Sequence, residues 1–126
     1  MGPNSVCAVL LRDGEVCRVI RRDQPGDFSL IGGKVEPTDA SPGEAIIREV
    51  KEEIGVKVIR ARWVFERVDS KDGNTAWCYV IDEWEGEPHQ CELGIEVSWG
   101  KPETLLTAGC TFREYNRKLF EHLRLI

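Results

Sequence analysis

The chain has 126 residues, of which 41% are hydrophobic and 31% are charged, and its formal net charge is −5. This length predicts one domain, residues 1–126, that buries roughly two thirds of its unfolded surface. The acidic balance argues against a nucleic-acid polymer as a partner, because such partners select basic surfaces. We see no signal peptide and no apolar run of the ~18 residues that span a bilayer, so we expect a soluble, cytoplasmic protein without a membrane partner.

The first part of the chain is predicted to form strands. Residues 6–12 and 15–22 are rich in apolar residues, and Asp13-Gly14 between them is a strong signal for a two-residue hairpin turn. After a loop, residues 28–31 are predicted as a short strand that runs into a pair of glycines. The chain is therefore expected to open with a hairpin.

A helix is predicted over residues 42–54, with boundary signals at both ends. Ser41 is a favourable N-cap, Pro42 suits the first helical position, and Glu44 completes a capping box. Gly55 can take the left-handed conformation that ends a helix. These signals fix the direction in which the helix side chains point.

The second half of the chain adds further strands and helices. The pattern predicts strands at 56–68, 74–84 and 96–99, a turn at 70–73, a short helix at 102–106 and an amphipathic helix from Thr111 onward. Strands before, between and after two main helices predict a mixed sheet covered on both faces. The pattern alone supports either an α/β or an α+β class.

Three glutamates on the predicted helix carry the functional signal. Glu49, Glu52 and Glu53 are three and four positions apart, so they crowd together on one helix surface and repel one another. They begin beside the apolar stripe of the helix, where a cleft could form. Carboxylates are the ligands that hard cations such as Mg²⁺ prefer. The alternative is a solvated acidic face with Arg48 and Lys51 as partners.

The segments around these glutamates resemble the Nudix box. That pattern is Gly, five residues, Glu, seven residues, then Arg-Glu-U-X-Glu-Glu-X-Gly-U with U apolar, and residues 48–56 match its second half completely. In the first half, which begins at Gly33, Asp39 stands where the pattern has Glu, and eight residues rather than seven separate it from the second half. Ile31 also replaces the proline common before the glycine pair. The extra residue is expected to lengthen the loop before Ser41 and to leave the helix in register.

The resemblance implies an α/β/α sandwich and the hydrolysis of a nucleoside diphosphate linked to another moiety, by attack of water at phosphorus with Mg²⁺ or Mn²⁺. A compact chain resembles the MutT-type members, which release a nucleoside monophosphate and pyrophosphate. The leading hypothesis is a Mg²⁺-dependent nucleoside triphosphate pyrophosphohydrolase, with oxidised purine deoxynucleotides among its candidate substrates. The alternatives are a dinucleoside polyphosphate or nucleotide-sugar hydrolase of the same family and a non-catalytic nucleotide-binding module. A homodimer is also compatible with the sequence.

The resemblance also implies roles for residues of the box. Glu49, Glu52 and Glu53 are implied as metal ligands, with Glu52 or Glu53 also a candidate base for the attacking water. Arg48 is implied to orient them through a charge-assisted bond across one turn, and an ordinary pair with Glu52 is the alternative. The Gly32 carbonyl is similar in position to a backbone metal ligand of MutT-type members.

Further charged residues complete the predicted site. Lys34 and Arg22 are expected to contact phosphate, although Arg21 and Arg22 could equally be edge-strand charges. In such sites an acid from the loop before the last strand often serves as base or ligand. Glu92 is the first choice for this catalytic acid and Glu96 the second, and for each the alternative is a surface carboxylate.

The base-binding pocket gives few signals. Trp77, Trp99, Phe112 and Tyr115 could stack on a base, and Asn116 could bind its edge by hydrogen bonds. A core position is the favoured interpretation for the tryptophans and Phe112, since aromatic side chains are often buried. Substrate identity therefore depends mainly on size and resemblance.

The five cysteines are odd in number and include no C-x-x-C pair, so they are predicted to be reduced thiols. His89 and Cys91 could form half of a zinc site, but no second pair supports it. The cysteines are Cys7, Cys17, Cys78, Cys91 and Cys110.

Overall fold

The computed structural model describes residues 4–68 and 73–126, so most of the predicted turn at 70–73 lies outside the described residues. The strands are β1 (Ser5–Val9), β2 (Leu11–Arg12), β3 (Glu15–Arg21), β4 (Ile31–Lys34), β5 (Lys57–Val68), β6 (Thr75–Glu85) and β7 (Ile95–Gly100). The helices are α1 (Pro42–Ile54), the 3-10 helix η1 (Pro102–Leu105) and α2 (Arg113–His122).

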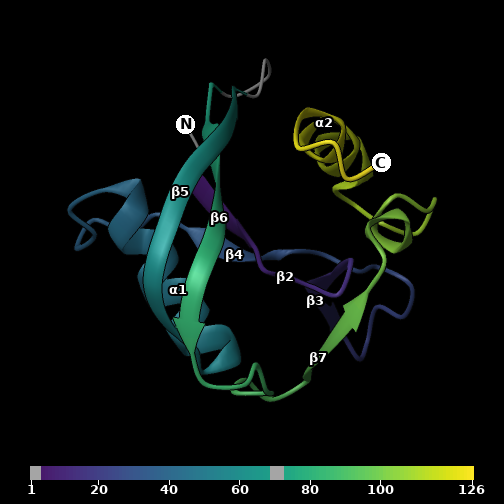
Figure 1. Ribbon diagram of the computed structural model, residues 1–126, viewed down its shortest axis with the longest axis horizontal. Coiled ribbons are helices and arrows are strands. Elements are labelled where there is room, and N and C mark those ends of the chain that lie inside the picture. The colour runs from purple at the N-terminus through teal and green to yellow at the C-terminus, as the bar shows by residue number, and fades with distance from the viewer. Residues whose placement is uncertain (1–3, 69–72) are drawn as a thin grey trace.

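The strands form two sheets, and α1 and α2 lie on opposite sides of them (Figure 1). One sheet has the strand order β4-β1-β6-β5, in which β1 and β6 run parallel and the other pairs antiparallel. The second sheet has the order β2-β3-β7 and is antiparallel. The predicted layers of helix, sheet and helix are confirmed, whereas the sheet expected as one is divided in two.

The division falls at Leu10, which interrupts the first predicted strand. β1 pairs with β4 and β6, whereas β2 continues into the turn and pairs with β3. Asp13 and Gly14 have φ values of 54° and 79°, as a tight hairpin turn requires. Leu10 is fully buried, and its carbonyl still accepts a hydrogen bond from the Cys17 N–H at 3.0 Å. The hairpin turn is confirmed, and the prediction of one continuous strand at 6–12 is wrong.

Helix α1 begins and ends where the sequence predicts. The Ser41 hydroxyl accepts a hydrogen bond from the Glu44 N–H at 3.2 Å, and the Glu44 carboxylate accepts one from the Ala40 N–H at 2.9 Å. At the other end, Gly55 has φ 72°, and its N–H donates to the Lys51 carbonyl at 3.1 Å. These bonds fix the helix register and hence the direction of its glutamates.

Two apolar clusters hold the layers together. On the α1 side, Ile46, Val50 and Ile54 are fully buried against the strands. On the α2 side, Leu119 and Phe120 are fully buried as well. Burying an aliphatic or aromatic side chain of this size contributes roughly 1.5–3 kcal/mol. Helix α1 is therefore anchored by its apolar face and presents its acidic edge beside β4, against which it packs.

Strand β4 does not lie where it was predicted. It begins at Ile31 rather than at Phe28 and runs through the glycine pair. Neither glycine is among the residues with positive φ, so the expected loop is a strand. A Cβ on Gly32 would overlap the Val6 carbonyl oxygen of the neighbouring β1, so this close pairing depends on a residue without a side chain. The glycine pair therefore brings the backbone of β4 close to its neighbours.

The last third of the described chain follows the prediction closely. Strand β7, the short helix η1 and the amphipathic helix α2 all form within a few residues of their predicted bounds. None of the helices within residues 4–68 and 73–126 is long and apolar enough to cross a membrane.

Candidate active site

Glu53 is the buried acid of the predicted metal set, with 7% of its surface exposed. Its Oε2 accepts a hydrogen bond from the Gly32 N–H of β4 at 3.1 Å. Burial, reinforced by the charges of Glu49 and Glu92, raises the pKa of Glu53 to about 8, although the Gly32 hydrogen bond lowers it. A carboxylate whose charge is so unfavourable when alone is one that a bound cation would stabilise.

Glu49 lies one turn earlier and fills space beside Gly33. A Cβ on Gly33 would lie only 2.5 Å from Cδ and Oε1 of Glu49, so the absent side chain makes room for the carboxylate. Burial raises the pKa of Glu49, while its hydrogen bond with Arg48 lowers it. The glycine pair thus serves both glutamates, since Gly32 provides an N–H and Gly33 provides space.

Arg48 is the centre of an ion-pair network. Its Nε and Nη2 bind the Asp39 carboxylate at 3.0 and 2.9 Å, and its Nη1 donates to Glu49 and Glu52 at 3.0 and 3.1 Å. Nη2 also donates to the Lys34 carbonyl at 3.0 Å. The bond to Asp39, followed by that to Glu49, raises the pKa of Arg48, while burial lowers it. The geometry fits the predicted orienting role, and the pair with Glu52 is one part of it.

The lengthened loop delivers Asp39 to Arg48. The Asp39 carboxylate also accepts a hydrogen bond from the Glu36 N–H at 2.8 Å, and its own N–H donates to the Glu36 carbonyl at 2.9 Å. The hydrogen bonds with Arg48 and Glu36 lower the pKa of Asp39, in that order. Asp39 therefore binds the Nε and Nη2 atoms of the guanidinium group, whereas Glu49 and Glu52 bind its Nη1.

Glu52 and Glu92 are the exposed acids of the site. The side chain of Glu52 is 53% exposed, and Glu92 is exposed in the loop between β6 and β7. The charge of Glu92 is among those that raise the pKa values of Glu49 and Glu53. Glu96 instead pairs with Arg22 at 3.3 Å. Of the two predicted acids, Glu92 is thus the one whose charge changes pKa values in the acidic cluster.

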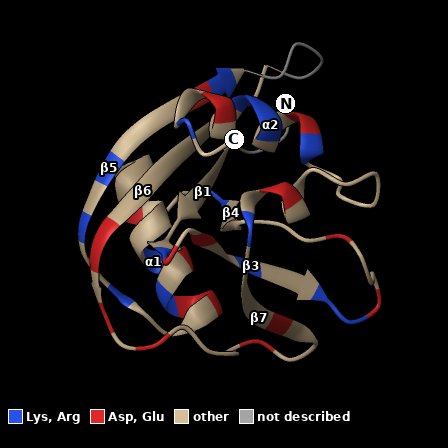
Figure 2. Cartoon of the chain, turned by 45° about the vertical axis from the view of Figure 1, so that its right-hand side comes forward, with Lys and Arg blue, Asp and Glu red and all other residues tan. Residues whose placement is uncertain are grey.

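The carboxylate oxygens of this cluster suit Mg²⁺ in their chemistry, but they do not converge on one point. Within the described part of the chain, no three acidic, histidine or cysteine side chains converge closely enough to hold a metal ion. Figure 2 shows acidic and basic residues side by side on α1, and Arg48 holds both Glu49 and Glu52. Carboxylate oxygens suit Mg²⁺ in kind. Arg48 bonds to Oε1 of Glu49 and to Oε2 of Glu52, which leaves the second oxygen of each carboxylate for a cation.

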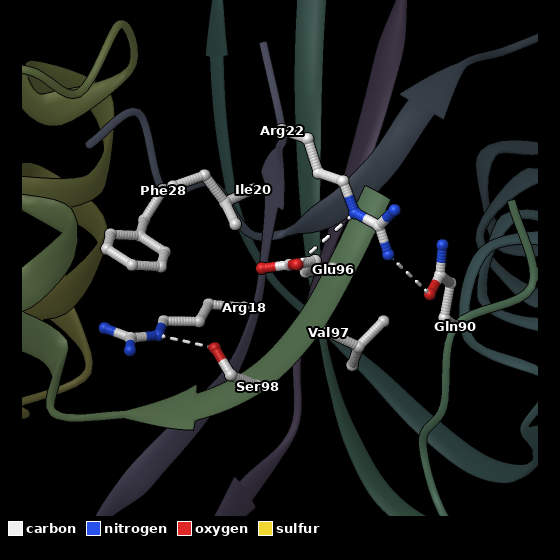
Figure 3. Close-up of a pocket in the computed structure, with 8 residues that line it drawn as sticks. All are labelled: Arg18, Ile20, Arg22, Phe28, Gln90, Glu96, Val97 and Ser98. Carbon is white, nitrogen blue, oxygen red and sulfur yellow. Dashed lines mark hydrogen bonds and ion pairs between the residues drawn. The ribbon is translucent and has the colours of Figure 1, made fainter. Parts of the chain in front are cut away.

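A pocket of about 490 Å³ opens on the β3–β7 sheet (Figure 3). The strand register places Arg18 opposite Ser98 and Ile20 opposite Glu96. Arg18 donates from Nε to the Ser98 hydroxyl at 3.0 Å, and its guanidinium lies over the Phe28 ring, 3.8 Å from the centroid. The lining residues are Arg18, Ile20, Arg22, Phe28, Gln90, Glu96, Val97 and Ser98.

Arg22 lines this pocket and contacts the loop that carries Glu92. Its Nε lies 3.3 Å from the Glu96 carboxylate, and its Nη2 donates to Oε1 of Gln90 at 3.4 Å. Gln90 in turn donates from Nε2 to the Glu92 carbonyl at 3.1 Å. The loop of residues 86–94 therefore contacts the pocket through Gln90. It also carries Glu92, whose charge raises the pKa values of Glu49 and Glu53.

Sequence reasoning found Arg22 but missed Arg18, Phe28, Gln90 and Ser98. A signal for Arg18 existed, because alternate residues of a strand share one face and Arg18 stands four positions before Arg22. The register that brings Ser98 opposite Arg18 has no such local signal.

Two predicted substrate-binding residues lie in different settings. Asn116 is 2% exposed, and its Nδ2 donates to the Leu105 carbonyl at 3.3 Å. It joins α2 to η1 in the interior and does not line the pocket, and its hydrogen bond to a base stays a prediction. Lys34 is exposed at the end of β4, and its contact with phosphate stays a prediction, as does the metal role of the Gly32 carbonyl.

The aromatic residues considered for base stacking also lie elsewhere. Trp77 and Trp99 pack against the cluster on the α1 side, and Tyr115 packs against the cluster on the α2 side, which confirms the core interpretation for the tryptophans. Phe112 is 58% exposed, so a core position was wrong for it. Phe28, rather than any of these four, supplies the ring of the pocket.

The match to a family model covers nearly all of this chain. Residues 1–123 match the NUDIX domain. The chain therefore belongs to the Nudix family, as the motif at 48–56 and the paired glutamates on α1 indicate.

Characterised relatives are similar over part of their length. The chain is 39% identical over 62 residues to the CTP pyrophosphohydrolase of Escherichia coli K12, which is 47% of this chain and 45% of that protein. It is 32% identical over 73 residues to the 8-oxo-dGTP diphosphatase of the same organism, covering 56% of this chain and 47% of that protein. The matches thus span about half the length of these relatives.

A solved structure is similar over the whole fold. A MutT structure from a study of the Aliivibrio salmonicida and Vibrio cholerae proteins superimposes with a TM-score of 0.75 at 26% identity. It covers 96% of this chain and 95% of that chain. The Nudix fold of this chain is therefore shown by sequence and by structure.

Proposed function

We propose that this chain is a Mg²⁺-dependent nucleoside triphosphate pyrophosphohydrolase that releases a nucleoside monophosphate and pyrophosphate. The observation that carries the proposal is the position of Glu49 and Glu53 against the glycine pair of β4, together with a pocket whose lining residue Gln90 lies in the same loop as Glu92. Membership of the Nudix family and the names of the two bacterial relatives support the same reaction class.

Each residue of the cluster is proposed to have a separate role in phosphoryl transfer. This reaction requires that the phosphate and the attacking water are positioned and that the charge on the phosphate oxygens is neutralised. Glu49, Glu52 and Glu53 would hold Mg²⁺, which when bound neutralises phosphate oxygens and acidifies water. Arg48 fixes the carboxylates, and its hydrogen bonds set their starting positions. Glu92 is exposed and acts electrostatically on the cluster, and it is the proposed acceptor of the proton from the attacking water.

The pocket on the β3–β7 sheet is proposed to take the nucleoside part of the substrate. Its volume of about 490 Å³ lies within the range of small-molecule sites. Phe28 offers an aromatic surface, while Glu96 and Ser98 offer hydrogen-bonding groups. Arg22 lines this pocket and contacts Gln90 in the loop that carries Glu92, so its guanidinium is the proposed contact for the phosphate chain. Likeness to the two relatives makes CTP and oxidised purine deoxynucleotides the first candidates.

A panel of nucleotides tests the reaction. The purified chain is incubated with Mg²⁺ and with CTP, 8-oxo-dGTP, the common nucleoside triphosphates, a dinucleoside polyphosphate or a nucleotide sugar, and pyrophosphate and inorganic phosphate are measured separately. We expect pyrophosphate from at least one triphosphate. Turnover of the dinucleotide or the nucleotide sugar alone would move the assignment to that branch of the family. Tight binding with no turnover of any member would indicate a binding module.

Substitution of Arg22 tests the proposed path of the phosphates. Arg22→Ala is expected to raise KM about 10-fold with kcat changed by less than about twofold, because a charge-assisted bond to phosphate contributes about 1.5 kcal/mol. The matched control is Arg113→Ala, which removes an exposed arginine at the start of α2. An unchanged KM in the Arg22 variant would remove this residue from the substrate path.

A further inference from the structure

His89 and Cys91 form a pair that the proposed hydrolysis does not use. Both residues are exposed in the loop before β7, and Sγ of Cys91 lies 3.4 Å from Nε2 of His89. All five cysteines are free, as predicted, and in the ranges that the structure describes no third ligand joins this pair into a metal site. The geometry therefore leaves a thiol and an imidazole facing each other.

The hydrogen bonds of the imidazole show where its protons are. Nδ1 of His89 lies 2.9 Å from the Glu87 carbonyl oxygen, and because a carbonyl can only accept, Nδ1 carries a proton and donates it. In the neutral ring Nε2 is then an acceptor, and the Cys91 thiol donates to it. Cys91 is thus the nucleophile, His89 is its base, and the Glu87 carbonyl orients the base. This is the arrangement that activates a thiol.

The pair is held in place from three directions. The Glu87 carboxylate forms two bonds of 2.8 Å with Arg12, and the His89 N–H donates to the Ile54 carbonyl at 3.0 Å. A Cβ on Gly55 would collide with the imidazole and would lie 2.9 Å from the sulfur. The imidazole is thus packed directly onto the end of α1, which limits its rotation away from the thiol.

We propose that Cys91 is a modification site, at which a thiol activated by His89 reacts with soft electrophiles such as hydrogen peroxide. Sγ attacks one peroxide oxygen, so that an S–O bond forms and the O–O bond breaks. The thiol proton passes to Nε2 of His89 and then to the departing hydroxide, which leaves as water. The sulfur is oxidised by two electrons to a sulfenic acid, and the peroxide is reduced.

The position of Cys91 connects this chemistry with the active site. Its neighbours in the chain are Gln90, which contacts Arg22, and Glu92, whose charge acts on Glu49 and Glu53. Because Sγ hydrogen-bonds with His89, whose imidazole packs on Gly55, an oxygen added to the sulfur changes the contact that holds this part of the loop on α1. We therefore expect modification to slow nucleotide hydrolysis several-fold, a consequence that rests on the proposed function.

The test measures the reactivity of each cysteine in the intact chain. The protein is treated with a small excess of iodoacetamide, and the alkylated fraction of all five cysteines is followed by mass spectrometry of peptides. Cys91 is expected to react fastest. His89→Gln is expected to lower its rate about 10-fold, because the thiol loses its base. The matched control is His122→Gln, which changes the second of the two histidines and should leave the rate unchanged.

Each outcome decides the proposal. An unchanged Cys91 rate in His89→Gln, or an equal fall in both variants, would overturn it, and His89→Asn repeats the test if the first variant fails to fold. In a second arm, hydrogen peroxide followed by a sulfenic-acid probe is expected to label Cys91, and the accompanying loss of hydrolysis should be absent in Cys91→Ser. Labelling does not depend on turnover, so a chain that hydrolyses no nucleotide but keeps the His89 effect would refute only the proposed function.

Discussion

The two parts of the active site are built in opposite ways. The acidic cluster comes from neighbouring positions on one helix, supported by two adjacent glycines of β4. The pocket joins residues that are far apart in the chain, as the hydrogen bond between Arg18 and Ser98 across 80 positions illustrates. The groups of the acidic cluster are therefore set by local sequence, whereas the pocket exists only after distant strands have paired.

The two parts also differ in burial, and this difference predicts how each responds to change. Glu53 is buried with a raised pKa, whereas the side chain of Arg22 is 56% exposed. Changes in the cluster should act on kcat and on metal binding, and changes in the pocket should act on KM.

The largest effect is expected from the glutamates themselves. Glu53→Gln and Glu52→Gln should each lower kcat by at least ~100-fold, since each removes a charged metal ligand or base. The measurement is Mg²⁺-dependent release of pyrophosphate from the preferred nucleotide. Glu121→Gln, an exposed glutamate on α2, is the control and should have normal activity. Near-normal kcat in both cluster variants would remove the cluster from the site.

The raised pKa of Glu53 should make the metal-free protein less stable as pH rises. Folded Glu53 keeps its proton up to about pH 8, whereas the unfolded chain releases it near the ordinary value of 4.5. Between these values the folded state binds more protons, so the stabilisation present below the lower value is lost as pH rises through the upper one. We expect the free energy of unfolding in a chelator to fall by about 5 kcal/mol over this window, at about 1.36 kcal/mol per unit of pKa.

Urea unfolding of Glu53→Gln is the comparison that isolates this effect, because glutamine stays neutral at every pH. Most of the pH-dependent fall in the free energy of unfolding should be absent in the variant. Adding Mg²⁺ should restore the stability of the natural chain near pH 8. Identical pH profiles for the two proteins would mean that Glu53 does not hold its proton in the folded state.

An intermediate effect is expected at Gly33. Gly33→Ala places a Cβ where the Glu49 carboxylate lies, so that carboxylate must move, and we expect kcat to fall about 20-fold with a weaker affinity for Mg²⁺. Gly43→Ala is the control, because a Cβ there meets no atom closer than 3.7 Å and alanine favours a helix. Equal activity of the two variants would show that the space beside Glu49 does not matter.

The smallest effect is expected at Asp39. Asp39→Ala removes the partner of Nε and one partner of Nη2 of Arg48, but the bonds of Nη1 to the glutamates and of Nη2 to the Lys34 carbonyl remain. We expect kcat to fall about fivefold, less than for either glutamate. A loss as large as that of Glu53→Gln would mean that Asp39 reaches the metal itself.

Local signals predicted the bounds of helix α1 correctly. The cap at Ser41 and the left-handed Gly55 depend only on hydrogen bonds within a few residues, so sequence defines them well. The same holds for the turn at Asp13-Gly14. The direction of the three glutamates follows from these boundaries and from the apolar face of α1.

Features that depend on strand pairing could not be predicted in this way. The break at Leu10, the course of the glycine pair as a strand and the pocket wall at Ser98 all follow from which strands lie side by side. The surroundings of Asn116 could not be predicted for a related reason. Its polarity suggested a binding role, but its partner is a backbone carbonyl of η1 that the sequence does not identify.

The break at Leu10 has a consequence for how substrate preference can change. One buried residue joins the sheet that supports the glutamates to the sheet that forms the pocket wall. Substitutions at the pocket-lining positions of β3 and β7 can therefore reshape the pocket, provided that Cys17, Val19 and Ile95 of the same strands keep their packing in the core beside α1. A chain divided in this way could acquire a new ligand preference without rebuilding its acidic cluster, which makes these pocket-lining positions the part to exchange in engineered variants.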